Sequence, residues 1–340
     1  MIVDSAYYQD GRRQDEGTLP LQEAAARRDQ GGFVWLELSE PGEEELAQVR
    51  DTFGLHELAI EDALDSHMRP KIENYDQDVQ LVILRTAHYD DAAEEVEFGE
   101  ISVFLAPTFV ITVRQGAASE LRGVRQRLEQ RPDLLAAGSA SVLWAILDWV
   151  VDGYAPVVAE VDRDIDQIEA SVFSGAAAPT ERIYSLRREV TGFYRAVHPL
   201  VGVTGTVERL VDKKLRHYLR DVRDDLLLVE EEVAGQRDLL GTILEANTAV
   251  ITAEQTRVSV QQNSTIEQLT ILSTVFLPLT FVTGFFGQNF GWLVGHIAGP
   301  VAFIGYGIGG LVLPLALLFL WLRYRAPTSS HRRAFPKISR

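Results

Sequence analysis

The residues best suited to chemistry lie in and just before a stretch that carries no formal charge. From residue 268 to residue 322 the sequence contains no Asp, Glu, Lys or Arg. Neutral polar, apolar and small residues recur there mostly at three- and four-residue steps, the spacing that puts side chains on one face of a helix. Copied around a symmetry axis, this face predicts a pore with polar rings near both ends and an apolar middle. The face comprises Asn263, Ile266, Leu269, Leu277, Thr280, Gly284 and Gly287.

The uncharged stretch is long enough to cross a bilayer twice. A membrane span needs about 20 largely apolar residues, and two such runs, 269–286 and 301–322, are separated by a short glycine-rich break. A buried hairpin in a soluble domain is the alternative, but so long an uncharged interval is unusual there. We therefore predict a first span at 268–287, an outer loop at 288–300 and a second span at 301–322.

The flanking charges predict how the spans are oriented. The tail 323–340 carries six Lys or Arg residues and no acid, whereas the loop 288–300 carries neither sign of charge. Because Lys and Arg flanks stay on the cytoplasmic side, we expect the tail and the N-terminal part to be cytoplasmic in an inner or plasma membrane. The first residues lack the apolar core of a secretory signal peptide.

The composition argues against several other classes of protein. A net charge of −17 does not suit a nucleic-acid partner. The absence of cysteine excludes disulfides, thiolate metal sites and a cysteine nucleophile. No phosphate-binding loop, zinc-protease motif or serine-hydrolase elbow occurs. We expect a protein that is not an enzyme.

The elements that must carry the apolar spans form two cytoplasmic regions. Region 1–135 alternates strand-like and helix-like runs, which predicts an α/β domain with strands at 33–38, 79–84, 100–105 and 108–113. Between the first two strands we predict a helix that begins at Ser39 and ends at Gly54, followed by a second helix over 56–64.

Region 136–267 has the period of helices. We predict helices over 139–173 and 180–198, the second ending at Pro199, and then one helix over 206–267 that continues into the first span. At 1.5 Å per residue this last helix alone measures roughly 90 Å. Its apolar stripe needs partners, which favours an oligomer.

The sequence at the end of the first span resembles the CorA metal-ion transporter family. The resemblance rests on TVFLPLTFVTGFFGQNF, which ends in a Gly-x-Asn signature, and on the two spans that close the chain. Earlier segments, among them FVWLELSEPGEEELAQVRDTFGLHELAIEDAL and SVLWAILDWVVDGYAPVVAEVDRDIDQIEASVF, are similar to family segments in the same order. The resemblance implies a funnel-shaped homopentamer whose long stalk helices continue into a pore for divalent cations.

The resemblance also implies roles for individual residues. Gly287, Gln288 and Asn289 would form the selectivity filter, with Asn289 as a metal-contacting outer ring. The pore would be lined by Asn263, Ile266, Leu269, Leu277, Thr280 and Gly284. Neutral oxygens suit Mg²⁺, which gives up its water shell reluctantly, and membrane potential would drive uptake. Mg²⁺ is the expected substrate and regulator, with Co²⁺ or Ni²⁺ as further substrates.

Two departures from the family pattern leave alternatives open. Gln288 stands where family members usually have methionine, and the outer loop lacks the acids common in magnesium-transporting relatives. His296 is the loop's only titratable group, and copies of it near a pore mouth favour Zn²⁺ or Ni²⁺. A proton-coupled Zn²⁺ transporter of the ZntB type is therefore one alternative, and a non-conducting, membrane-anchored cation sensor is another.

The acid excess of the cytoplasmic part predicts regulation by internal cations. Carboxylates of neighbouring subunits would repel when metal is scarce and be bridged when it is plentiful, so that internal Mg²⁺ holds the pore shut. Asp224 and Asp225 are the candidate ligands, and Glu230, Glu231 and Glu232 are the alternative. A charge run that is simply a solvated face is the competing interpretation.

Overall fold

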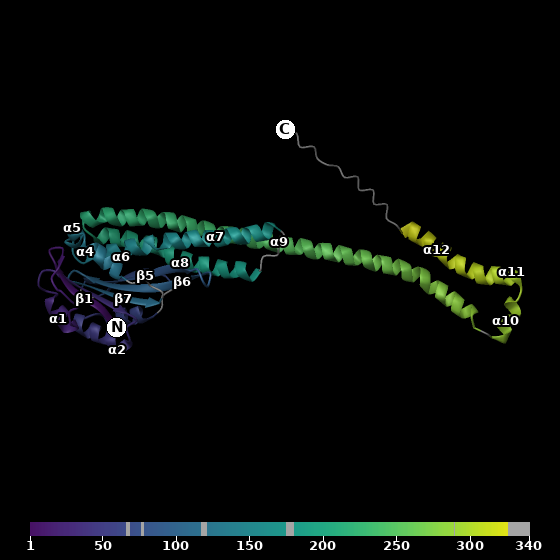
Figure 1. The fold of residues 1–340 in the computed structure, drawn as a ribbon, viewed down its shortest axis with the longest axis horizontal. Helices are drawn as coiled ribbons and strands as arrows, with labels where there is room; N and C mark the ends of the chain where they lie inside the picture. Colours follow the sequence, from purple (N-terminus) through teal and green to yellow (C-terminus); the bar gives the residue numbers. More distant parts are fainter. Residues whose placement is uncertain (66–68, 76–77, 117–120, 175–179, 289, 326–340) are drawn as a thin grey trace, which may run out of the picture. The chain divides into compact units, whose positions relative to one another are not determined.

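The computed structural model describes residues 1–65, 69–75, 78–116, 121–174, 180–288 and 290–325. The chain forms two compact units, Met1–Ile251 and Thr252–Arg340. The first contains a mixed sheet with helices on both faces, and the second is helical (Figure 1).

The sheet of the first unit has seven strands in the order β2-β1-β3-β7-β6-β5-β4. Strands β3 and β7 pair in parallel, and the other neighbours pair antiparallel. The predicted strands correspond to β3, β5, β6 and β7. The strands are β1 (Ile2–Gln9), β2 (Arg12–Arg13), β3 (Phe33–Ser39), β4 (Lys71–Tyr75), β5 (Val79–Asp90), β6 (Glu95–Ala106) and β7 (Phe109–Gly116).

Both faces of the sheet are buried, which explains why its central strands are continuously apolar. On β3, Val34 and Leu36 point into one core, which includes residues of α2 (Glu43–Phe53) and α3 (Glu57–Leu64). The alternate residues Phe33 and Trp35 point into the other core, which helices α4 to α9 share. Figure 1 shows α1 (Leu21–Arg27) and α2 on one side of the sheet and the longer helices on the other.

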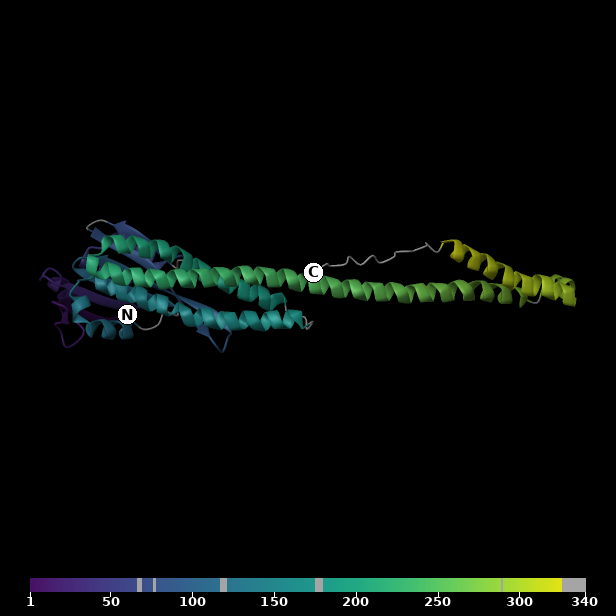
Figure 2. The ribbon, with the colours of Figure 1, turned by 90° about the horizontal axis from the view of Figure 1, so that it is seen from above.

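The helices of the larger core run side by side over the sheet (Figure 2). Two short helices precede four long ones. They are α4 (Arg122–Glu129), α5 (Pro132–Leu135), α6 (Ala140–Asp152), α7 (Tyr154–Phe173), α8 (Thr180–Leu210) and α9 (Lys213–Phe286).

Three predicted helix boundaries are wrong. Ser39 belongs to β3, and α2 begins after Gly42, which has an extended backbone and no side-chain cap. Pro199 lies inside α8 rather than at its end, because buried residues on both sides of it, Val197 and Leu200, pack into the core. The next helix begins at Lys213, not at Thr206, after a break at 211–212 that contains neither proline nor glycine.

Gly153 divides the predicted helix over 139–173 into α6 and α7. The predicted C-terminus of α2 is confirmed, because Gly54 adopts the left-handed conformation with φ of 74°. That conformation favours glycine, which has no Cβ to clash.

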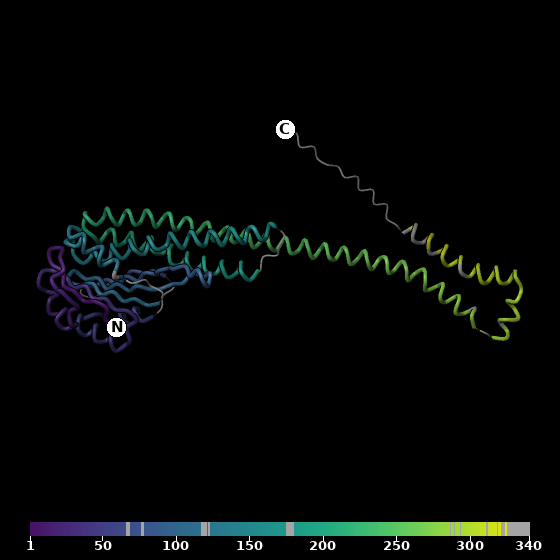
Figure 3. Tube along the Cα trace, in the orientation of Figure 1, coloured from purple at the N-terminus to yellow at the C-terminus, as the bar shows by residue number. Residues whose placement is uncertain are grey.

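The second unit begins within α9, which runs without interruption to Phe286 and contains Pro278. The chain then turns back through short helices into the longer helix α12, as the trace in Figure 3 shows. The elements are α10 (Gly291–Ile297), α11 (Pro300–Ala302), the π-helix η2 (Phe303–Ile308) and α12 (Gly309–Arg325).

Within the described residues, three helical stretches are long and apolar enough to cross a membrane. In the stretch Ala140–Phe173, 61% of the most apolar window is buried inside the protein, so its apolar side chains are used by the core. The most apolar windows of Lys213–Phe285 and Pro300–Leu317 have no buried residues. Apolar helices that the protein does not cover need a lipid or protein environment, which makes these two the candidate spans.

Candidate ion pathway and cytoplasmic carboxylates

The six residues predicted to line a pore all lie on α9, and all six are exposed: Asn263, Ile266, Leu269, Leu277, Thr280 and Gly284. Leu277, for example, is 74% exposed. Among the half-buried residues of the same segment, Val275, Leu279 and Val282 lie opposite the predicted face, because successive residues are about 100° apart. Thr274 and Pro278 are half-buried as well and lie toward its flanks. The predicted face is thus exposed, but so are side chains on other sides of this helix segment, Ile271 and Leu272 among them.

The hydroxyl groups of the span bond to the helix itself. Thr280 donates a hydrogen bond from Oγ1 to the carbonyl oxygen of Phe276 at 2.8 Å. Thr270 bonds in the same way to Ile266 at 2.7 Å, and Thr283 to Leu279 at 2.9 Å. Each hydroxyl proton is thus used, while the oxygen lone pairs remain to accept hydrogen bonds. Such oxygens can accept hydrogen bonds from the water shell of a cation.

The two glycines at the end of this helix, Gly284 and Gly287, differ in the room that surrounds them. At Gly287 an added Cβ would lie 3.0 Å from the carbonyl oxygen of Thr283, which receives the Gly287 N–H bond at 2.9 Å. The N–H of Gln288 bonds to the carbonyl oxygen of Phe285 at 3.3 Å. Gly284 meets no atom within 4 Å of an added Cβ. Asn289, the predicted outer ring, lies outside the described residues.

The predicted regulatory carboxylates lie on the part of α9 that belongs to the first unit. Asp224 and Asp225 are both exposed. Burial raises the pKa of Asp225, and the carboxylates of Asp221, Asp152 and Asp224 raise it further. Asp225 therefore belongs to a group of acids that disfavour each other's ionisation.

Sequence reasoning missed the partners of Asp225 on α6. Asp148 and Asp152 are one helical turn apart. Burial, and next the carboxylate of Asp152, raise the pKa of Asp148 to about 6, although Arg127 opposes this shift. Two acids at this spacing in an otherwise apolar helix were the signal that could have found them. Among the described residues no group of three or more His, Cys, Asp or Glu side chains is arranged to hold a metal.

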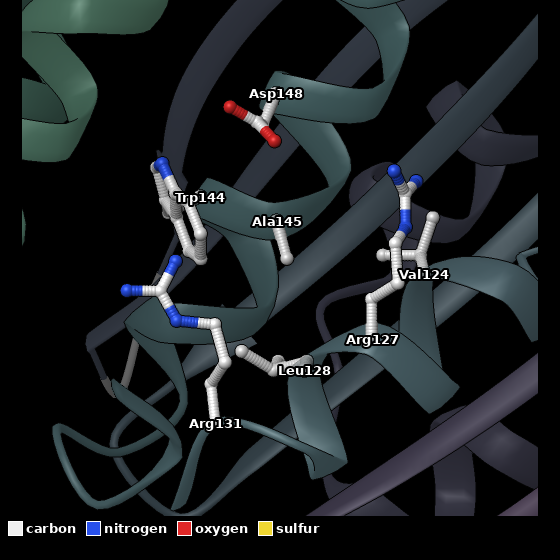
Figure 4. A pocket seen from close by; sticks show the side chains of 7 residues that line it. All are labelled: Val124, Arg127, Leu128, Arg131, Trp144, Ala145 and Asp148. Atoms are coloured by element: carbon white, nitrogen blue, oxygen red, sulfur yellow. The ribbon is translucent and has the colours of Figure 1, made fainter. Parts of the chain in front are cut away.

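Asp148 also borders a hollow of about 140 Å³ between α4 and α6. Figure 4 shows Arg127, Arg131 and Trp144 around it. Arg131 donates a hydrogen bond to the hydroxyl of Tyr218 on α9 at 3.1 Å. This hollow thus lies beside the contact between α6 and α9, where the rings of Trp144 and Tyr218 meet.

The alternative carboxylates on α9 are partly engaged. Glu230 accepts a hydrogen bond from His198 Nδ1 at 2.8 Å, whereas Glu231 and Glu232 are exposed.

Comparisons with known proteins place this geometry in a family. The family model described as CorA-like Mg²⁺ transporter protein matches residues 30–325. The cobalt/magnesium transport protein CorA of Thermotoga maritima is 27% identical over 81% of this chain and 78% of its own.

Solved structures show the same fold. The complete structure of the CorA magnesium transporter from Methanocaldococcus jannaschii matches with a TM-score of 0.59 and 18% identity, over 95% of this chain and 98% of that one. The cytoplasmic domain of ZntB from Vibrio parahaemolyticus matches with a TM-score of 0.52 and 13% identity, over 73% of this chain and 97% of that one. Because the family model covers residues 30–325, which include β3 to β7, the long helices and both apolar stretches, this membrane protein belongs to the CorA-like Mg²⁺ transporter family.

Proposed function

We propose that this protein transports divalent cations, with Mg²⁺ as the main substrate and Co²⁺ or Ni²⁺ as further substrates. The match of the family model over residues 30–325 carries the proposal. The cation passes without covalent change, so the proposal includes no enzymatic step. We place the protein in the inner or plasma membrane as a homopentamer with both termini cytoplasmic.

The proposed pathway follows the predicted polar and apolar face of α9. Thr280 offers lone pairs to the water shell of the cation, because its proton is bonded to Phe276. Ile266, Leu269 and Leu277 form apolar rings that close the pathway when they shed water. Gly287, Gln288 and Asn289 form the filter at the outer end. An inside-negative potential favours entry of a divalent ion by about 4.6 kcal/mol per 100 mV.

Metal flux into proteoliposomes tests this proposal. Mg²⁺, Co²⁺, Ni²⁺ and Zn²⁺ are supplied separately, with and without an inside-negative potential. We expect Mg²⁺ entry that rises with the potential and is lost in Asn289→Ala. Asn74→Ala is the matched control, because Asn74 is an exposed asparagine on edge strand β4 of the first unit.

Other outcomes contradict the proposal in distinct ways. Zn²⁺ entry that follows a proton gradient would indicate a ZntB-like transporter. No flux of any ion, with a metal-dependent conformational change retained in Asn289→Ala, would indicate a cation sensor.

We further propose that internal Mg²⁺ closes the pathway by bridging carboxylates that include Asp224 and Asp225. The repulsion that raises the pKa of Asp225 supports this, because a bound cation would relieve it. The double variant Asp224→Ala with Asp225→Ala should transport Mg²⁺ at internal concentrations that stop the wild type. An unchanged dependence of flux on internal Mg²⁺ would remove these residues from the proposal.

A further inference from the structure

His296 is the one imidazole among the uncharged residues 268–322, and it lies in the last turn of α10. Its side chain is exposed. The loop 288–300 has no Asp or Glu, so no carboxylate there competes with this ring for a cation. His296 is therefore the strongest single metal-binding side chain that the loop offers.

The hydrogen bond of His296 determines which ring nitrogen carries the proton. Nδ1 lies 2.9 Å from the carbonyl oxygen of Trp292, one turn earlier. A carbonyl oxygen only accepts, so Nδ1 must be the donor. In the neutral ring Nε2 then has a free lone pair. Histidines that bind metals usually donate their other N–H to a carbonyl or carboxylate in this way, which orients the ring and makes it a better ligand.

The ring of Trp292 holds His296 in place as well. The two ring centroids are 4.4 Å apart, and the planes are inclined by 28°. Stacking and the hydrogen bond together fix a side chain that would otherwise rotate freely at the surface. Less conformational freedom is then lost when a ligand binds.

We propose that His296 captures transition-metal divalent cations, Zn²⁺, Ni²⁺ or Co²⁺, through Nε2 on the loop side of the membrane. Imidazole suits these ions, whereas Mg²⁺ prefers oxygen ligands. The location at a pore entrance, and the presence of several copies around one axis, rest on the proposed transport function. Binding by single imidazoles is weak and transient, as an ion that must move on requires.

Metal titration of the full-length protein in detergent tests the binding step independently of transport. Isothermal titration with Ni²⁺ and with Zn²⁺ compares the wild type with His296→Gln. We expect the variant to bind these ions about tenfold more weakly or not at all. The control is His217→Gln, which removes an exposed histidine from the cytoplasmic part of α9 and should leave this binding event unchanged.

Flux measurements then test specificity. In proteoliposomes, His296→Gln should reduce Ni²⁺ and Zn²⁺ entry at limiting concentration about tenfold and leave Mg²⁺ entry unchanged. An equal loss of all three fluxes would mean that the histidine only supports the loop, which overturns the inference. So would unchanged Ni²⁺ and Zn²⁺ binding in the variant. Absence of Mg²⁺ flux in the wild type would contradict the proposed function, while the titration would still decide the role of His296.

Discussion

Asp148 is the residue whose environment most affects its charge. It is half-buried on α6 and, within the described part of the chain, accepts no hydrogen bond. Burial and the nearby carboxylates raise its pKa from 3.8 to about 6. The folded protein therefore disfavours ionisation of the Asp148 carboxyl. The protonated carboxyl costs the fold nothing at pH values below the pKa that Asp148 has in the unfolded chain, and the fold loses stability as pH rises from there through about 6.

We predict that Asp148→Asn stabilises the metal-free protein at neutral pH. The variant removes the cost of ionisation, which amounts to about 1–2 kcal/mol after allowance for solvent screening. In thermal unfolding in detergent with a chelator, the midpoint of the variant should exceed that of the wild type by an amount that grows between about pH 4 and pH 6 and is small below that range. A difference of the same size at pH 4 and pH 7 would contradict ionisation of Asp148 as its cause.

The contact between β1 and β3 depends on a residue without a side chain. Gly32 precedes β3, and a Cβ added there would lie 2.0 Å from the carbonyl oxygen of Tyr8 and 2.9 Å from the ring of Tyr7. The backbone of β1 cannot move away freely, because Tyr8 pairs with Phe33 in the sheet.

We predict that Gly32→Ala destabilises the protein by about 1–3 kcal/mol, the usual cost of overpacking. Its thermal midpoint should fall by several degrees. Gly17→Ala is the matched control, because an added Cβ there meets no atom within 4 Å. A midpoint shift of equal size in both variants would argue against the clash as the cause.

The spacing of apolar residues predicted which segments are helical, but it did not predict where the helices begin and end. The pattern of apolar residues predicted the long helices, because it reflects which side each helix buries. Pro199 is a strong local stop signal, yet burial of Val197 and Leu200 keeps α8 intact through it. The break before Lys213 has no proline or glycine to announce it.

The arrangement of the whole chain in the membrane can be tested without background labelling, because the sequence has no cysteine. Gly295 in the loop 288–300 and Gly17 in the first unit both have open space around an added Cβ. We predict that a membrane-impermeant maleimide added to intact cells labels Gly295→Cys and labels Gly17→Cys only after permeabilisation. Labelling of Gly17→Cys alone in intact cells would reverse the proposed orientation.

The sequence by itself determined the two apolar stretches, the polar and apolar order along one face of α9, and the Gly-x-Asn signature of Gly287 and Asn289. These properties depend on spacing within one helix, which is local. Only the tertiary structure brought Asp148 and Asp152 on α6 into the group that contains Asp225, because their approach depends on how helices far apart in the chain pack in one core. Likewise, the local fold of α10 decided which nitrogen of His296 is free to bind a cation, since that depends on the position of one backbone carbonyl.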